Sequence, residues 1–522
     1  MRTEISPKNQ EIGATSRVRE RLNTLIRKLR WRAYWLAPNL IRIHNRDDDY
    51  ERKREKESNE AGRVPVEDEL RIRMIWGVEV FGPNEIDGLY KSLKTLGWNT
   101  GFIRSEEENA LRWVQRQRTY GGDGWYNVGL VVRKSERRRW IGRPSEAELP
   151  NGVDHLQVRI YQITPALTCL VVGFALNEEV AKRYEIELNL DRRTHRKRGK
   201  RWVISHLEPS HQKQQAIADA RAELQCTISD WFSRTIPGYF TTRGLGKNLP
   251  FAELLSTAED DVFAERELKV GFDWRRILAN VSSRDIWTSK DIPALKFVLK
   301  QPEFGDATRN RIVASVSVAA LPQDSLKMYG DVTNLCHEAL DGLLAYFGVS
   351  LYLSELSRDL KIAREELNLS KSSRRTLEII ERIQRFFDGN VGIPVAAREL
   401  RDVTKRSGWL RHYCGPFMAT DWSDKNRTRD FATELQTNLH RTASALIEDE
   451  SSTREHFEQL STVLSIRESV RAQRRMEFVA FLALVVATIT LAADMPASWL
   501  VYAKGCLSSF ANYVVLPWFP RH

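Results

Sequence analysis

Cysteine is scarce in this sequence, which holds five cysteines among 522 residues. They lie far apart, and no two have the spacing of a zinc site or of a redox motif: Cys169, Cys226, Cys336, Cys414 and Cys506. This spacing argues against disulfides and zinc sites, and it indicates that the bulk of the chain sits in a reducing compartment. The N-terminus has no short apolar core with a cleavage site, so we expect no secretory leader.

Motifs for catalysis are also missing. The sequence has no serine nucleophile elbow, kinase set or deaminase set. Gly244–Lys247 (GLGK) lacks the spacing of a phosphate-binding P-loop, and Gly121–Gly124 (GGDG) is a flexible turn that does not directly follow a strand. A proline separates His206 from His211, so we do not expect them to share a helical face as metal ligands. These absences predict a protein that is not an enzyme, with no identified cofactor.

The composition is that of a folded, basic protein. Hydrophobic residues make up 42% and charged residues 29% of the chain, which supports two or three domains with real cores. The net charge is +11, from 80 Lys and Arg against 69 Asp and Glu. Such a balance fits an anionic ligand, an anionic lipid surface or nucleic acid, and it fits equally well a basic solvated surface.

Residues 1–61 form the first predicted region. The segment from Ser16 to His44 is basic and places Val18, Leu22, Leu25 and Leu29 at helical spacing. Two interpretations stay open for this helix, which could lie on an anionic membrane surface or pack on the next domain. Asn45–Ala61 has no apolar period and predicts a solvated linker.

Residues 62–324 predict a cytosolic α/β domain with a mixed sheet. Five segments have the pattern of strands: 70–81, 126–132, 155–162, 167–175 and 311–321. Residues 184–190 alternate strictly and predict a hairpin with residues 202–207. Helices are expected at residues 85–98 and 210–234, and short ones at 251–256 and 293–300.

Residues 325–423 predict a helical region, with helices near 329–367, 372–387 and 396–407. One very long helix should follow, because residues 417–495 contain neither Gly nor Pro. Its stalk, residues 424–477, carries a partial heptad at Leu439, Ala443, Leu446, Phe457, Leu460 and Leu464. That seam could pack on neighbouring copies or on the preceding helices of the same chain.

The stalk leads into an uncharged apolar run at residues 478–493. Arg471, Arg474 and Arg475 precede this run, as the positive-inside rule expects of a cytoplasmic flank. A second apolar segment at residues 499–518 has aromatic residues near both ends but also contains Lys504 and Asn512. We therefore expect a C-terminal transmembrane hairpin in the inner (plasma) membrane, with the N-terminal domain in the cytoplasm. The alternatives are a single span and a buried core helix.

The order of these elements resembles the CorA family of divalent-cation channels, most specifically over the last hundred residues. That family carries Gly-Met-Asn at the end of its first span, where this chain has Ala493-Asp494-Met495-Pro496. The resemblance implies a pentameric homo-oligomer with a pore and divalent cations as cargo. Asp494 and Met495 would lie at its mouth and Asn512 would face its interior, although Asp494 could equally be the last residue of a helix. Divergent relatives in bacterial antiviral defence imply a nucleotide messenger as the controlling ligand.

The densest positive patch lies between the two predicted hairpin strands. It comprises Arg192, Arg193, Arg196, Lys197, Arg198, Lys200 and Arg201. These side chains could hold an anionic ligand, while the competing interpretation is a solvated hairpin tip. His195 is the only aromatic residue interleaved with these charges, so the loop offers little surface on which bases could stack, and we do not expect nucleic acid as a partner.

Two functions follow from these patterns. The first is an oligomeric membrane channel, transporter or membrane-permeabilising effector, controlled by the cytosolic domain. The second is a membrane-anchored sensor or scaffold, whose α/β domain binds an anionic ligand or a protein partner.

Overall fold

The computed structural model describes most of the chain. The described residues are 8–37, 45–98, 109–140, 144–198, 204–263, 273–279, 286–299, 311–370, 376–389, 392–406, 408–420 and 427–493. The chain divides into two compact units. The sheet unit comprises Met1–Ile362 and Arg385–Asp449, and the helical unit comprises Ala363–Gln384 and Glu450–His522.

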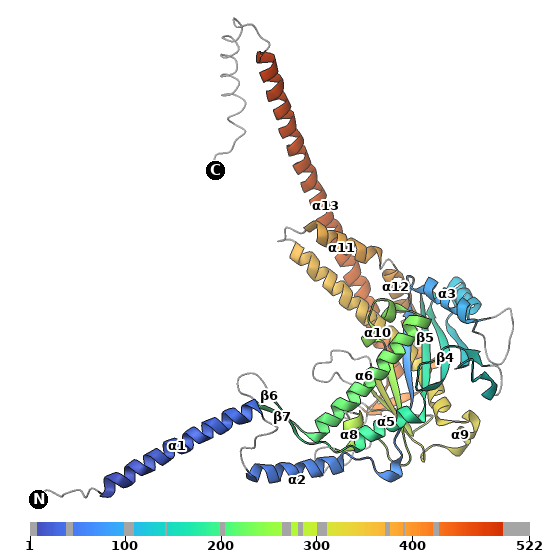
Figure 1. The fold of residues 1–522 in the computed structure, drawn as a ribbon. Coiled ribbons are helices and arrows are strands. Elements are labelled where there is room, and N and C mark those ends of the chain that lie inside the picture. Colours follow the sequence, from blue (N-terminus) through green and yellow to red (C-terminus); the bar gives the residue numbers. More distant parts are fainter. Residues whose placement is uncertain are drawn as a thin grey trace, which may run out of the picture. The chain divides into compact units, whose positions relative to one another are not determined.

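An eleven-stranded mixed sheet forms the centre of the sheet unit (Figure 1). Its strand order is β13-β12-β9-β10-β11-β8-β1-β5-β4-β2-β3. Neighbouring strands are antiparallel except in the pairs β8/β11 and β2/β3. The strands are β1 (Arg71–Phe81), β2 (Gly124–Val132), β3 (Ser145–Glu146), β4 (Val153–Thr164), β5 (Leu167–Leu176), β8 (Phe251–Thr257), β9 (Trp287–Ser289), β10 (Leu295–Leu299), β11 (Arg311–Ser317), β12 (Phe417–Thr420) and β13 (Thr428–Asp430).

The sheet unit also contains helices and a small hairpin. The helices are α1 (Lys8–Leu36), α2 (Asn45–Ala61), α3 (Ile86–Leu96), α4 (Ala110–Tyr120), α5 (Glu178–Asn189), α6 (Pro209–Thr235), α7 (Tyr239–Thr242), α8 (Trp274–Ala279), α9 (Gln323–Tyr329) and α12 (Ile393–Thr404). The hairpin pairs β6 (His195–Arg198) with β7 (Ile204–Leu207). Three further helices belong partly to the helical unit: α10 (Val332–Ser370), α11 (Thr376–Asp388) and α13 (Phe431–Ala493).

One face of the sheet packs against α6. Gly77 in β1 lets this helix approach closely, because a Cβ at Gly77 would lie 2.6 Å from the ring of Phe232 and 2.7 Å from Ile228. The ring of Phe174 in β5 meets Trp231 and Phe232 edge to face, at centroid distances of 5.3 and 6.1 Å. Aromatic rings in this arrangement bury a large apolar area in the core.

The opposite face packs against α10. Because side chains alternate along a strand, Trp76 and Val78 point away from the face that Gly77 occupies. Trp76 donates its indole N–H to Nδ1 of His337 on α10 at 3.0 Å. A Cβ at Gly348 would lie 2.7 Å from Val78, so this helix also lies close to the strands. The sheet is therefore covered by helices on both faces.

The predicted α/β domain with a mixed sheet and the helices after it are present, but three segments were assigned wrongly. Residues 184–190 were expected to be a strand and belong to α5. Their alternation is misleading, because Ala181, Tyr184 and Leu188 are buried at helical spacing while Ile186 is exposed. Residues 251–256 and 293–300 were expected to be helices and hold β8 and β10. Every residue of β8 is buried, so its sequence shows no alternation that would reveal a strand.

Two stretches that were expected to be irregular or helical also differ. Asn45–Ala61 was expected to be a solvated linker and forms α2. The long stalk helix begins at Phe431 rather than near residue 424, because β12 and β13 precede it at the edge of the sheet. The ring of Phe431 packs against Trp287 and Phe297, which joins the start of α13 to the core. Of the partial heptad, Leu439, Ala443 and Leu446 are buried inside the sheet unit.

The transmembrane hairpin predicted at residues 478–493 and 499–518 is not borne out. Phe478 to Ala493 is the C-terminal end of α13. Across the part of the chain that the structure describes, no helix is long and apolar enough to cross a bilayer. The physical reason is length, since a spanning helix needs about 20 apolar residues and the charged Glu477 immediately precedes this run. The second segment lies outside the described residues.

This finding overturns the functions that depended on the hairpin. The absence of a spanning helix among the described residues contradicts three predictions. These are the inner-membrane location, ion transport through a membrane channel and the membrane-anchored scaffold. The resemblance to the CorA family and the proposed oligomer stay predictions. So do the domain boundaries drawn from the sequence.

The helical unit combines the end of α10, most of α11 and the second half of α13. Within it, Ala363, Ile383 and Thr453 are buried. Large apolar side chains toward the end of α13 are exposed instead: Phe478, Val479, Phe481, Leu482, Leu484, Val486, Ile489 and Leu491.

Candidate functional site

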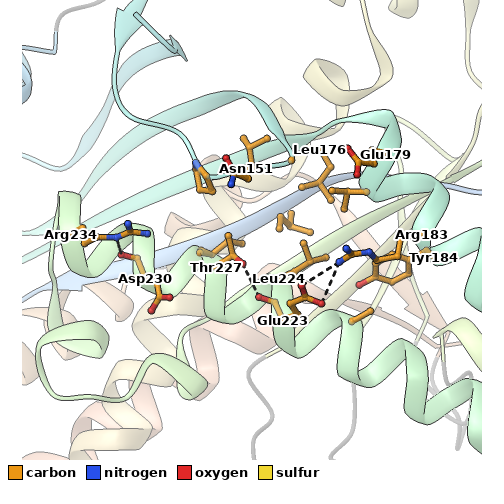
Figure 2. Close-up of a pocket in the computed structure, with 17 residues that line it drawn as sticks. Asn151, Leu176, Glu179, Arg183, Tyr184, Glu223, Leu224, Thr227, Asp230 and Arg234 are labelled. Carbon is orange, nitrogen blue, oxygen red and sulfur yellow. Dashed lines mark hydrogen bonds and ion pairs between the residues drawn. The ribbon is translucent and has the colours of Figure 1, made fainter.

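A cleft opens between α5 and α6 on one face of the sheet (Figure 2). Its volume is about 440 Å³, which is the size of a pocket for a small organic molecule. Ile75 of β1, Leu224 and Ile228 of α6 and Leu176 of β5 give it an apolar lining. Polar and charged side chains from both helices and from the loop at Asn151 surround that lining (Figure 2).

The local sequence explains why α5 turns back over the sheet at this point. Asn177 follows β5 directly and caps α5, since its side-chain oxygen accepts the backbone N–H of Val180 at 3.0 Å. The neighbouring loop contains Gly152, whose φ of +80° favours glycine. A Cβ there would lie 2.6 Å from the side chain of Val180. Asn177 and Gly152 together fix the wall of the cleft.

The charged groups lie toward two ends of the cleft (Figure 2). At one end, Arg183 forms an ion pair with Glu223 at 3.3 Å, and Glu179 lies nearby on the same helix. At the other end, Arg234 donates its Nε–H to the backbone oxygen of Asp230 at 3.1 Å. Within the described ranges, no ion pair holds the guanidinium of Arg234. The cleft therefore offers groups of both signs to a ligand.

Tyr184 is the buried polar side chain of the cleft. It lines the cavity, is 2% exposed, and its hydroxyl makes no hydrogen bond to any described residue. Burial raises the pKa of this hydroxyl, so it stays protonated at neutral pH and can both donate and accept. A buried hydroxyl without a partner is unfavourable, and a bound ligand could satisfy it.

A buried ion pair supports the cleft from beneath. The guanidinium of Arg221 on α6 donates its Nε–H to one carboxylate oxygen of Glu253 on β8 at 2.8 Å, and its Nη2 lies 2.6 Å from the other oxygen as an ion pair. It also donates to the backbone oxygen of Leu278 at 2.5 Å. Both side chains are almost fully buried, at 2% and 0% exposure. This bidentate contact fixes α6 on the sheet, so the cleft has a rigid base.

The basic patch predicted from the sequence is partly neutralised by neighbouring acidic side chains. Arg192 pairs with Glu187, and Arg196 pairs with Glu51 of α2. Arg193 and Lys197 are exposed, and Arg198 belongs to β6. Lys200 and Arg201 lie outside the described residues. The five described residues of the patch, from Arg192 to Arg198, belong to β6 and the chain just before it.

The remaining predicted sites do not come together. His206 belongs to β7 and pairs with Glu51 at 3.4 Å, whereas His211 belongs to α6. In the part of the chain with described coordinates, no three His, Cys, Asp or Glu side chains gather as a metal site. The predicted pore residues Asp494, Met495 and Asn512 lie outside that part. A divalent cation as cargo stays a prediction.

Sequence reasoning missed the cleft itself. Its wall at Tyr184 was assigned to a strand, which removed α5 and with it half of the lining. The signal available in the sequence was the helical spacing of Ala181, Tyr184 and Leu188, all of which are buried in the structure. Comparison with known proteins gives no guide here, because no protein-family model and no curated protein matches the chain.

Proposed function

We propose that the sheet unit is a binding module for a small zwitterionic organic molecule, held in the cleft between α5 and α6. The observation that carries the proposal is a cavity of about 440 Å³ with an apolar lining and a buried, unpartnered Tyr184 hydroxyl. Ligand pockets typically combine an apolar wall with a few polar groups that orient the ligand.

The charges around the cleft suggest which ligand it takes. The carboxylate of the ligand would meet the guanidinium of Arg234. The Nε–H of this guanidinium already donates to the backbone carbonyl of Asp230, which leaves its two NH₂ groups for the ligand. Its cationic group would meet Glu179 at the other end, and an apolar body would cover Leu224 and Ile228. Free amino acids and dipeptides with apolar side chains have this distribution of charge. Binding rather than catalysis follows, because the cleft combines no nucleophile with a base.

A plugged variant tests the proposal. Thr227 lies at the centre of the cleft lining, so Thr227→Phe should fill it (Figure 2). The control is Ala222→Phe, which adds the same side chain to an exposed position of α6 that does not line the cleft. We would screen apolar amino acids and dipeptides by thermal shift and measure the best of them by isothermal titration calorimetry.

We expect binding to the unmodified protein and to Ala222→Phe, and none to Thr227→Phe. Arg234→Met should weaken binding by about tenfold or more, because it removes a charge-assisted hydrogen bond. The proposal fails if no zwitterion of the panel binds, or if the plugged variant binds as well as the control.

A further inference from the structure

The first turns of α6 contain a buried cation without a counter-ion. Lys213 is 0% exposed, and its ammonium forms no hydrogen bond or ion pair within the described part of the chain. Burial lowers the pKa of Lys213, and the nearby guanidinium groups of Arg63 and Arg192 lower it further, while Asp191 opposes them. Placing an ammonium in an apolar interior is costly unless an anion accompanies it.

The neighbouring charges do not supply that anion. Asp191 accepts two hydrogen bonds from the guanidinium of Arg63, at 2.7 and 2.9 Å. Glu187 pairs with Arg192. Each carboxylate therefore already has its own arginine, and Lys213 remains as an excess positive charge. It lies where the end of α2, the chain before β6 and the start of α6 meet, which we call the junction.

The ammonium lies at the end of α2. A Cβ placed on Gly62 would come within 3.1 Å of the Nζ of Lys213, so the absence of a side chain at Gly62 makes room for the ammonium. The same hypothetical Cβ would lie 3.1 Å from the backbone oxygen of Ser58. Asn59 connects this end of α2 to the chain before β6, since its amide accepts from the backbone N–H of Arg192 at 3.0 Å and donates to the Arg192 oxygen at 2.8 Å.

Three more polar groups of this junction are buried without a partner. The hydroxyl of Ser210 in the first turn of α6 and the hydroxyl of Ser58 in α2 make no hydrogen bond, at residue exposures of 0% and 6%. The Nε–H of Arg192 is also unpaired. The N-terminus of α6 has no side-chain cap, and its helix dipole adds to the positive potential.

Every one of these groups can donate a hydrogen bond, and the nearby carboxylates of Asp191 and Glu187 are already engaged by arginines. We propose that the junction binds a phosphate group, with Lys213, Arg192, Ser210 and Ser58 as donors, and that the bound anion fixes α2 on α6. A tetrahedral oxyanion offers several acceptor atoms and compensates the charge of Lys213. The site differs from the cleft and does not depend on the function proposed above, and it shares Arg192 with the basic patch predicted from the sequence.

The test uses the full-length protein in a phosphate-free buffer. Inorganic phosphate would be added against sodium chloride of equal ionic strength, with thermal unfolding as one measurement and tryptic cleavage of α2 as the other. Four basic residues of α2 are exposed cleavage sites: Arg52, Lys53, Arg54 and Lys56. We expect saturating phosphate to raise the unfolding midpoint by about 2–4 °C and to slow cleavage of α2.

Variants separate binding from a structural role. Lys213→Met should abolish both responses, and without phosphate it should be at least as stable as the unmodified protein, because it removes an unpaired ammonium. Lys182→Met is the matched control, since Lys182 is an exposed lysine of α5 and should leave both responses intact. Ser210→Ala should weaken phosphate binding by about tenfold, and it keeps the test valid if Lys213→Met does not fold.

Adenosine monophosphate distinguishes two sources of the phosphate group. Protection by inorganic phosphate alone identifies a site for the free ion, whereas protection by both identifies a site for phosphate monoesters. The proposal is overturned if neither compound exceeds sodium chloride, or if Lys213→Met responds as the unmodified protein does.

Discussion

The two faces of the sheet are covered by helices in different ways. On the α10 face, the helix lies so close to its surroundings that only glycine fits at two positions. A Cβ at Gly342 would overlap the backbone oxygen of Tyr413, and one at Gly348 would press on Val78. On the α6 face, Gly77 marks a close contact of β1 with α6, yet a cleft of about 440 Å³ opens between α6 and α5. One face is closed by packing, and the other leaves room for a ligand.

Both faces also bury charges. Arg159 of β4 bridges Asp341 and, at 2.6 Å, Glu338, both on α10. Arg221 of α6 binds Glu253 of β8. Buried ion pairs add less stability than their number suggests, but they fix one relative position of helix and strand. The difference between the faces therefore lies in packing, and the following substitutions test it.

Arg159→Met should have the largest effect. It leaves Asp341 buried, at 4% exposure, without its cation. Breaking such a pair costs about 3–5 kcal/mol in the free energy of unfolding, measured by urea denaturation. The matched control is Arg137→Met, whose partner Glu146 forms a more exposed pair, and it should cost less than about 1 kcal/mol. If the two variants lost equal amounts of the free energy of unfolding, burial of the Arg159 pair would not be what makes it matter for stability.

Glu79 should make stability depend on pH. Burial raises the pKa of its carboxyl from the ordinary 4.5 to about 7, despite hydrogen bonds from the backbone N–H groups of Phe240 and Thr241. The folded state thus holds a proton that the unfolded chain releases. The contribution of Glu79 to the free energy of unfolding is fully present below pH 4.5. It decreases by about 3 kcal/mol as the pH rises to about 7.

Glu79→Gln removes this ionisation. Urea denaturation at pH 5 and pH 8 should therefore show a smaller difference in the variant than in the unmodified protein. A difference of the same size in both proteins would assign the pH dependence to other groups.

Gly342→Ala tests the closed face. The added methyl group collides with the backbone of Tyr413, which cannot move as a flexible side chain can. We expect a loss of about 1–3 kcal/mol by thermal or urea unfolding. Gly88→Ala is the control, because its Cβ would lie 3.7 Å from the nearest atom, and this change within α3 should stabilise by about 0.5–1 kcal/mol. A variant at Gly342 that is as stable as this control would show that the face is not tightly packed.

Ala220→Leu should have the smallest effect on stability. Ala220 lines the cleft, so the larger side chain enters free space instead of colliding with the core. We expect a change within about 0.5–1 kcal/mol in calorimetric unfolding. A loss as large as that of Gly342→Ala would mean that the cleft is closed, which would remove the contrast between the two faces.

Much of the fold could be predicted from local patterns. The strand at residues 71–81 and the helix at 209–235 have strong periodicity, and their boundaries follow from it. β8 could not be recognised, because a strand with neighbours on both sides and helices on both faces is buried throughout, so its sequence shows no alternation of apolar and polar residues. The short edge strand β12 depends on pairing with β9, which is far away in sequence, and β13 pairs in turn with β12.

The candidate sites were less accessible to sequence reasoning. The cleft requires two helices at one place on the sheet, and one of them was assigned to a strand. The arginines of the hairpin were conspicuous in the sequence, yet Arg192 and Arg196 are already paired. Lys213 gave no signal, because nothing in a helical sequence such as HQKQQA indicates that its lysine is buried.

The exposed side of α6 carries a built-in chemical reporter. Cys226 is exposed and adjoins Thr227 of the cleft, whereas Cys169, Cys336 and Cys414 are buried. Burial raises the pKa of the Cys169 and Cys414 thiols and raises that of Cys336 to about 12, so their thiolates are scarce at neutral pH. A maleimide dye should therefore label Cys226 before these three. Its fluorescence would follow ligand entry beside α6 without any engineered substitution.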